Sequence, residues 1–451
     1  MTKNDPHSLG TERIGKLLLQ YSIPAIIGMT ITSIYNIIDS IFIGHGIGPI
    51  AIAGLAVSFP LMNLVIAFCT LVSAGGSAIA SIRLGQRDNN GATEVLSHTL
   101  MLCLTNALFL GIISLILLDP ILILFGASAE TLPYARDFMQ IILIGSPISY
   151  VMIGLNNVMR ATGYPKKAML TSMVTVLFNI ILAPIFIFHF QWGMYGAAIA
   201  TVISQFIGMV WVLHHFMSKE STVHFQRGFW KMKKRIIKSI FAIGMSPFLM
   251  NICACLIVII INNGLQEHGG DMAIGAYGII NRLQTLFIMI VLGLTMGMQP
   301  IIGYNYGAQK IDRAKRTLHL GIISGVVITS TGFITCELFP HYVSAVFTDS
   351  NELIDLAASG LRIAVMMLPL VGAQIVISSF FQSIGKAKIS IFLSLTRQLL
   401  YLLPSLLIFP KLWGLNGIWA SMPISDALAF ITAIASLLFY IKRISKDSVT
   451  V

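Results

Sequence analysis

Long runs of apolar residues, separated by short polar stretches, dominate the hydrophobicity pattern of this chain. A helix needs about 20 apolar residues to cross the hydrocarbon core of a bilayer. On this criterion the pattern predicts twelve membrane-spanning helices, over residues 17–43, 51–80, 97–118, 135–158, 168–189, 194–216, 237–262, 274–302, 318–339, 360–382, 389–409 and 416–440. The predicted fold class is an all-α polytopic membrane protein. Because the number of spans is even, both termini are expected on the same side of the membrane.

The second half of the sequence repeats the first. Residues that match at a constant separation of 222 positions are Gly85 and Gly307, Phe125 and Phe347, Pro147 and Pro369, and Gly163 and Gly385. One position is then lost, because WGMYG at 192–196 matches WGLNG at 413–417. A fixed separation through six spans indicates an internal duplication. Each repeat holds an even number of spans, so we predict two six-helix lobes of the same orientation, related by a pseudo-two-fold axis along the membrane normal.

Charge predicts how the lobes are oriented. Most Lys and Arg residues lie near the two termini and in alternate loops, whereas the other loops carry mostly acids. Cytoplasmic loops of membrane proteins carry such an excess of basic residues. We therefore expect a multi-pass protein of the cell inner (cytoplasmic) membrane with both termini in the cytoplasm. The expected domains are an N-lobe at residues 1–217, a cytoplasmic connecting loop at 218–236 and a C-lobe at 237–451.

Composition favours a bilayer over a nucleic acid as the partner of this chain. Hydrophobic residues make up 56% and charged residues 10% of the sequence, and the mean hydropathy is +0.84. The net charge of +11 resides largely in short loops, where membrane topology explains it, so we expect no nucleic-acid partner. The five cysteines lie in apolar segments without disulfide or metal-ligand spacing, and we expect them to serve in packing.

Asp39 is a polar anomaly in the first predicted span. A charged side chain at the centre of a bilayer costs about 2.5–3.5 kcal/mol on insertion scales. A carboxyl group at this place must be protonated, paired, or exposed to water inside the helix bundle. We interpret Asp39 as a group that gains and loses a proton during transport. The alternative is a structural hydrogen bond to a neighbouring helix.

Charged side chains also occur inside the spans of the second half. Arg397 and Asp426 lie in consecutive spans and are expected to pair, because a buried charge without a partner is heavily penalised. We interpret this pair as structural, with coupling or substrate contact as the alternative. Arg282 lies early in span eight, where its side chain could instead extend to the outer membrane interface.

Neutral polar residues are candidates for the wall of a substrate cavity. In the first half these are Asn36, Asn156, Ser172, Thr175 and Gln205. Hydrogen bonds between helices, worth about 0.6 kcal/mol on average in one membrane protein, are the alternative explanation. The spans contain no serine–histidine, paired-acid or metal-ligand constellation, so we predict that the protein is not an enzyme and holds no cofactor and no structural metal.

Several segments together carry a resemblance to a known family. They are DSIFIGHGIGPIAIAGLA from Asp39 onward, RLGQRDNNGA after span two, FNIILAPIFIF in span five, WGMYGAAIATVISQ in span six and QPIIGYNYGA after span eight. Over essentially its whole length the chain resembles the MATE (multidrug and toxic compound extrusion) transporters, and among them the bacterial branch around MepA and DinF. The resemblance implies a twelve-helix, two-lobe exporter that moves amphipathic, often cationic compounds outward in exchange for H⁺ or Na⁺.

The resemblance also implies roles for single residues. Family members with a cation site in the N-lobe have an Asp on helix one, an Asn and an Asp on helix five, and a Thr on helix six. Asp39, Asn179 and Thr201 match three of these positions, whereas Ala183 stands in place of the second Asp. One acid offers less charge to Na⁺, a hard cation that prefers oxygen ligands, so we favour H⁺ as the coupling ion and keep Na⁺ at these three residues as the alternative. Pro24 in helix one is the candidate hinge, with a static kink as the alternative.

We therefore predict a secondary active antiporter that exports amphipathic cationic compounds by alternating access through a cleft between the lobes, acting as a monomer. A related alternative is a flippase for lipids or lipid-linked oligosaccharides, which often line their cleft with several Arg or Lys residues. An alternative of a different class is a membrane-embedded enzyme or scaffold.

Overall fold

The computed structural model describes residues 6–218, 221–225, 233–348 and 350–447, and in these ranges it contains helices and no strands. The helices are η1 (Pro6–Gly10), α1 (Ile14–Gly46), α2 (Pro49–Gly85), α3 (Asn89–Ile116), α4 (Leu118–Leu124), α5 (Leu132–Ile144), α6 (Ser146–Ala161), α7 (Pro165–Pro184), η2 (Ile185–His189), α8 (Gly193–Met217), α9 (Lys234–Gly307), α10 (Ile311–Leu338), α11 (Pro340–Ala345), α12 (Asn351–Ala364), α13 (Leu368–Ser383), α14 (Ala387–Leu395), η3 (Thr396–Leu402), α15 (Leu403–Trp413) and α16 (Leu415–Asp447). Within the described ranges, 10 stretches can each cross a membrane alone, and two bent pairs raise the number to 12. The prediction of twelve spans is confirmed.

Spans four and ten are each built from two helices. α5 and α6 form a bend of 55°, and α12 and α13 form a bend of 54°. The second helix of each pair has a proline in its first turn, Pro147 and Pro369 respectively. Proline fits there because the first backbone N–H groups of a helix have no partner inside the helix. These two prolines match in the sequence repeat, so the two bends are one feature that occurs twice.

Left-handed backbone conformations also recur at the repeat separation. The non-glycine pair Arg87 and Gln309 has φ values of 60° and 59°. Three glycine pairs follow the same rule: Gly48 with Gly270, Gly163 with Gly385, and Gly193 with Gly414. Gly270 also breaks the long α9 into two spans, Lys234–Gly270 and Met272–Gly307. The backbone therefore repeats even at Arg87 and Gln309, where the side chains differ.

Contacts between equivalent residues of the two repeats locate the pseudo-two-fold axis. Gln299 Nε2 donates a hydrogen bond to Ser77 Oγ at 3.2 Å. A Cβ on Gly303 would lie 2.1 Å from Ser81 Oγ. The members of both pairs are equivalent in the repeat, and equivalent positions meet only at a two-fold axis. The axis therefore passes between α2 and the second half of α9.

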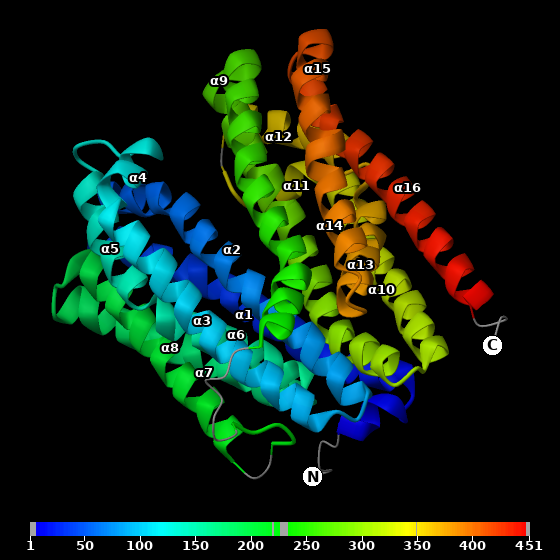
Figure 1. Cartoon of the computed structure of the whole chain (residues 1–451). Helices are drawn as coiled ribbons and strands as arrows, with labels where there is room; N and C mark the ends of the chain where they lie inside the picture. The colour runs from blue at the N-terminus through cyan, green and yellow to red at the C-terminus, as the bar shows by residue number, and fades with distance from the viewer. Residues whose placement is uncertain (1–5, 219–220, 226–232, 349, 448–451) are drawn as a thin grey trace.

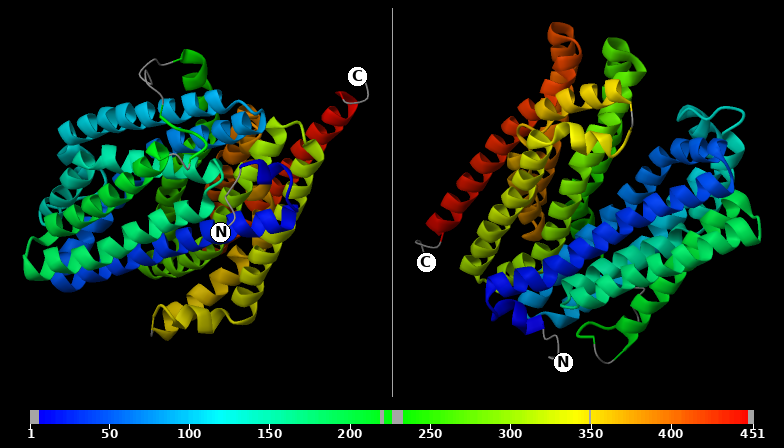
Figure 2. Two further views of the ribbon diagram at one scale, coloured as in Figure 1. Left: turned by 90° about the horizontal axis from the view of Figure 1, so that it is seen from below. Right: turned by 180° about the vertical axis from the view of Figure 1, so that it is seen from behind.

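The helices form two bundles that diverge from each other. Helices α1–α8 gather in one bundle and α9–α16 in the other (Figure 1). The bundles meet toward the end of the molecule where the N-terminus lies, and they separate toward α4 and the tips of α9 and α15 (Figures 1 and 2). We call these two ends the closed end and the open end.

Glycines allow backbone contact between the bundles toward the closed end. A Cβ would lie 1.7 Å from Leu71 O at Gly244, 2.0 Å from Ile240 O at Gly75, 2.0 Å from Tyr304 O at Gly85, 2.1 Å from Ile82 O at Gly307 and 2.5 Å from Ser22 Cα at Gly297. Any residue with a Cβ would force these helices apart. We call Gly75, Gly85, Gly244, Gly297 and Gly307 the glycine seam.

The segment that leads into α1 is held by the opposite bundle. Arg313, in the first turn of α10, donates to Leu9 O at 3.1 Å and to Glu12 O at 2.6 Å. Asn305 Nδ2 donates to Leu9 O at 2.9 Å, and Lys310 Nζ donates to Gly10 O at 2.8 Å. Leu9 and Asn305 are fully buried. These contacts tie the first bundle to the second at the closed end.

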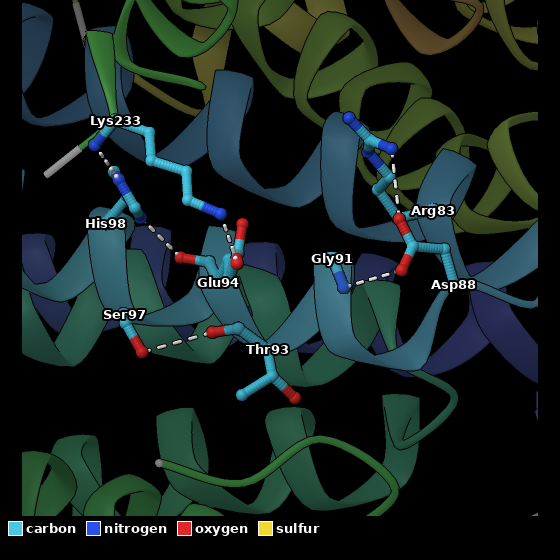
Figure 3. Close-up of polar contacts among 8 residues, drawn as sticks. All are labelled: Arg83, Asp88, Gly91, Thr93, Glu94, Ser97, His98 and Lys233. Carbon is cyan, nitrogen blue, oxygen red and sulfur yellow. Dashed lines mark hydrogen bonds and ion pairs between the residues drawn. The ribbon is translucent and has the colours of Figure 1, made fainter. Parts of the chain in front are cut away.

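The residue that leads into α9 is held in a corresponding way. Lys233, whose repeat counterpart is Thr11, donates its backbone N–H to His98 Nε2 at 2.7 Å (Figure 3). Its Nζ also forms an ion pair with Glu94. His98 Nδ1 donates to Glu94 O at 2.7 Å, which fixes the neutral tautomer that can accept at Nε2. Both bundles therefore hold the leading segment of the other.

Candidate functional site

Asp39 lies buried in the first bundle. Its side chain, on α1, is 7% exposed. Its Oδ1 is fully buried and has no hydrogen-bond partner in the described part of the chain. An ionised carboxylate is costly where its oxygen is withdrawn from solvent and no described donor faces it. This is the environment expected of a carboxyl group that exchanges a proton.

The structure brings Asn179 and Thr201 together. Asn179 on α7 donates from Nδ2 to Thr201 Oγ1 on α8 at 3.1 Å. The hydroxyl of Thr201 donates in turn to Ala197 O at 3.1 Å. Both side chains are buried. Two of the three predicted coupling residues therefore form one polar unit between neighbouring helices.

Packing of α1 against α7 places Asp39 at the level of that unit. Gly28 faces Ser172, since a Cβ would lie 3.9 Å from its Oγ, and Gly46 faces Ile187, since a Cβ would lie 2.3 Å from its Cγ2. The two helices thus run in parallel, and the middle of this interval brings Asp39 to the height of the turn from Asn179 to Ala183. No hydrogen bond joins Asp39 Oδ1 to that turn. Ala183 is fully buried, so an apolar group fills the place of the second acid.

The predicted cavity residues lie inside the first bundle. The side chain of Asn36 is outside the described residues. The other four have hydrogen bonds within or between helices: Asn156 Nδ2 and Ser172 Oγ donate to Ala168 O, Thr175 Oγ1 donates to Thr171 O, and Gln205 Oε1 accepts from Ser149 Oγ. None of these four lines the cavity described next.

A cavity of about 1140 Å³ lies between the bundles on the side of the open end. Its walls come from α1, α2 and the second half of α9. The polar lining residues are Thr30, Ser40, His45, Asn281, Arg282 and Thr285. Arg282 thus faces this cavity, and sequence analysis missed this lining because it did not reveal which faces of α1 and α9 are opposed. The one available signal was the charge of Arg282 within span eight.

The expected ion pair of the second bundle is present. Arg397 Nε lies 2.7 Å from Asp426 Oδ1, and the two side chains are 28% and 5% exposed. Arg397 belongs to η3, a π-helical turn between α14 and α15. Such turns often occur at functional sites, because one extra residue redirects the side chains. The stacked rings of Tyr277 and Trp419 belong to the core of the same bundle.

The candidate hinge Pro24 does not interrupt α1, which continues as one helix from Ile14 to Gly46. Among the described residues, no group of three or more His, Cys, Asp or Glu side chains is placed to hold a metal ion. The coupling role predicted for Asp39, Asn179 and Thr201 remains a prediction.

Comparison with known proteins gives concordant matches over the whole chain. The MatE family model matches residues 24–185 and 243–407. The multidrug export protein MepA of Staphylococcus haemolyticus (strain JCSC1435) is 29% identical over 419 residues, which cover 93% of this chain and 92% of that protein.

Solved structures agree with the sequence matches. The MATE multidrug transporter DinF-BH, solved in complex with a ligand, is 37% identical, with a TM-score of 0.89 over 95% of this chain and 96% of that one. A MATE protein crystallised in the bent conformation is 26% identical, with a TM-score of 0.92 over 99% of this chain and 98% of that one. These neighbours have the two-lobe, twelve-helix architecture predicted from the sequence.

Proposed function

The chain belongs to the MatE family of membrane transporters, and we propose that it is a secondary active antiporter that exports amphipathic cationic compounds in exchange for H⁺. The observation that carries the coupling step is the buried Asp39 carboxyl group, whose Oδ1 has no partner in the described part of the chain. Protonation from outside would remove the cost of a buried charge, and deprotonation toward the cytoplasm would restore it.

Alternating access is proposed from the arrangement of the bundles. The moving bodies are residues 1–217 and 237–451, joined by the loop at 218–236. The closed end holds the N-terminus and the basic loops, so the positive-inside bias assigns it to the cytoplasm. In this orientation the cavity opens outward and the glycine seam closes the cytoplasmic side. A single chain contains both bundles and the cavity between them, which supports a monomer as the functional unit.

Asn179 and Thr201 are proposed to support Asp39 during coupling. Their hydrogen bond provides neutral oxygen and amide groups at the level of Asp39. Neutral groups with one acid suit a proton better than Na⁺, which prefers several oxygen ligands. Pro24 is proposed to let α1 bend when Asp39 changes its protonation state, because proline removes one backbone hydrogen bond from the helix. Arg397 and Asp426 are proposed to brace the second bundle.

The test is dye efflux from vesicles that contain the purified protein, with ΔpH and ΔNa⁺ imposed separately. A ΔpH of one unit provides about 1.4 kcal/mol per proton, or about a tenfold dye gradient for one-to-one exchange. We expect the wild type to respond to ΔpH, and Asp39→Asn to insert normally but to lose the ΔpH response. Glu352→Gln, which changes an exposed acid on α12, is the matched control and should behave like the wild type.

Two outcomes would overturn parts of this proposal. Efflux driven by ΔNa⁺ alone would replace the proton with Na⁺ as the coupling ion. Normal ΔpH-driven efflux by Asp39→Asn would remove Asp39 from the mechanism.

A further inference from the structure

We infer that Arg282 makes the inter-lobe cavity a binding site for the carboxylate of zwitterionic amphipathic compounds. The inference rests on the proposed export function and deepens it, because it names a class of substrate within the amphipathic cations. The juxtaposition that carries it is a guanidinium group in a cavity wall whose other described residues are neutral or apolar.

The first argument is that Arg282 lies within a membrane span. The second span of α9 runs over 36 residues from Met272 to Gly307, and Arg282 lies about 15 Å from its start at 1.5 Å per residue. A charged side chain inside a span is expensive unless it faces water or a partner, and such residues in membrane proteins mark substrate or ion pathways. Arg282 faces the cavity, where water and solutes can reach it.

The second argument is that the Arg282 side chain has no partner among the described residues. Arg282 is exposed, and no hydrogen bond or ion pair joins it to another described residue. A guanidinium group carries five N–H donors in a planar fork that matches the two oxygens of a carboxylate. The half-buried arginine of this half, Arg397, already has its acid in Asp426. Arg282 therefore has its donors available for a ligand.

The charge of the cavity is the third argument. No Asp or Glu occurs among the described lining residues, and Arg282 is their one permanent charge. Ser40 lines the cavity, whereas its neighbour Asp39 is buried in the first bundle. His45, on the wall formed by α1, donates from Nδ1 to Ile41 O at 3.0 Å. Among the described lining residues a ligand thus meets one positive group and no carboxylate.

Shape and apolar surface complete the site. A volume of about 1140 Å³ is ample for a drug-sized molecule, since pockets for such ligands measure about 300–1,000 Å³. Phe59, Leu286, Met289 and Phe347 provide apolar lining. Adaptable Met and flat aromatic side chains accept varied ring systems. The ring system of a substrate would lie on these residues while its carboxylate pairs with Arg282.

The experiment uses two dyes that differ in one functional group. Rhodamine 6G is a cationic ethyl ester, and rhodamine 19 is the corresponding free acid, a zwitterion at neutral pH. Binding of each dye to the purified full-length protein is measured by fluorescence polarisation, and export of each dye is measured in vesicles. Binding tests the carboxylate site by itself, whereas export also depends on the proposed antiport.

We expect Arg282→Gln to weaken rhodamine 19 binding by roughly tenfold to 150-fold, as for the loss of a charge-assisted hydrogen bond, and to change rhodamine 6G binding less than twofold. Arg282→Lys keeps the charge but loses the planar fork, so it should bind rhodamine 19 more tightly than Arg282→Gln and less tightly than the wild type. Arg282→Glu should reverse the preference, with tighter rhodamine 6G and weaker rhodamine 19 binding. Arg362→Gln, an exposed arginine of α12 outside the cavity lining, is the matched control and should leave both affinities unchanged.

Equal effects of Arg282→Gln on both dyes would overturn the carboxylate site, and so would failure of the wild type to bind rhodamine 19. Absence of export together with the expected binding pattern would instead refute the proposed transport function and leave the site standing.

Discussion

Replacing Gly244 with alanine should shift the protein away from the conformation in which the bundles touch at the closed end. The added methyl carbon would lie 1.7 Å from Leu71 O and 2.6 Å from Leu71 C. Both are backbone atoms of α2, so rotation of a side chain cannot relieve the overlap and one bundle must move. Forcing extra atoms into a well-packed contact typically costs about 1–3 kcal/mol.

This cost falls on the closed arrangement alone, because the contact disappears when the bundles separate at that end. A penalty of about 1–3 kcal/mol lowers the ratio of closed to separated molecules by roughly 5-fold to 150-fold. The separated arrangement of Gly244→Ala should therefore gain by this factor over the wild type.

The assay is the distance between two spin labels by double electron–electron resonance. Labels at Asn90 and Lys388, which are exposed near the starts of α3 and α14, report on opposite bundles at the closed end. The matched control is Gly278→Ala in the same helix, where an added Cβ meets nothing within 4 Å. Alanine should be neutral or slightly stabilising there, because glycine weakens a helix by roughly 0.5–1 kcal/mol relative to alanine.

An unchanged distance distribution in Gly244→Ala, in protein with a wild-type melting temperature, would refute the role of the glycine seam. A shift of the same size in Gly278→Ala would show that the effect comes from helix propensity and not from contact with Leu71.

The other predictions concern the ion pair and the held leading segments. Asp426→Leu should destabilise the protein by about 3–5 kcal/mol in thermal unfolding, because it leaves a guanidinium group without its acid, and Arg397→Met in the same protein should restore most of that loss. If the double variant is as unstable as the single one, the pair is not the cause. His98→Ala and Arg313→Ala should each increase the separated population at the closed end several-fold in the spin-label assay. Since they hold different segments, their free-energy effects should add within about 0.5 kcal/mol, and a marked deviation would show that the two contacts act as one unit.

The number of spans was predictable because a membrane imposes one requirement on every helix. Each must present about 20 apolar residues to lipid, so the number of spans follows from hydrophobicity. The span ends follow less closely, since the span predicted at 237–262 extends from Lys234 to Gly270. The breaks within spans are set by local backbone chemistry and are harder to foresee. Pro147 and Pro369 were recognised as a matched pair, yet the bends beside them were not predicted. The short helices α4 and α11 were missed because the hydrophobicity criterion recognises only segments long enough to span the bilayer.

The candidate site was only partly predictable, because lipid-facing, bundle-facing and cavity-facing positions can have similar residues. The pairing of Arg397 with Asp426 followed from the cost of a lone buried charge and is confirmed. The lining of the inter-lobe cavity by Arg282 and His45 depends on how two distant helices oppose each other, which no local pattern encodes. The contact between Asn179 and Thr201 agrees with the family resemblance, whereas their coupling role remains a prediction.

The segments that lead into α1 and α9 are each held by the opposite bundle, and this has a consequence for the origin of the fold. In a dimer of two six-helix subunits, a terminal segment that each subunit lends to the other is a domain-swapped arm. Fusion of two such subunits into one chain would preserve this exchange of segments. The two copies of the contact could then acquire different residues. Here one leading segment is held by Asn305 and Arg313, and the other by Glu94 and His98. The closed end thus keeps the geometry of a dimer but holds its two exchanged segments with different residues, whereas the two copies in a homodimer must be the same.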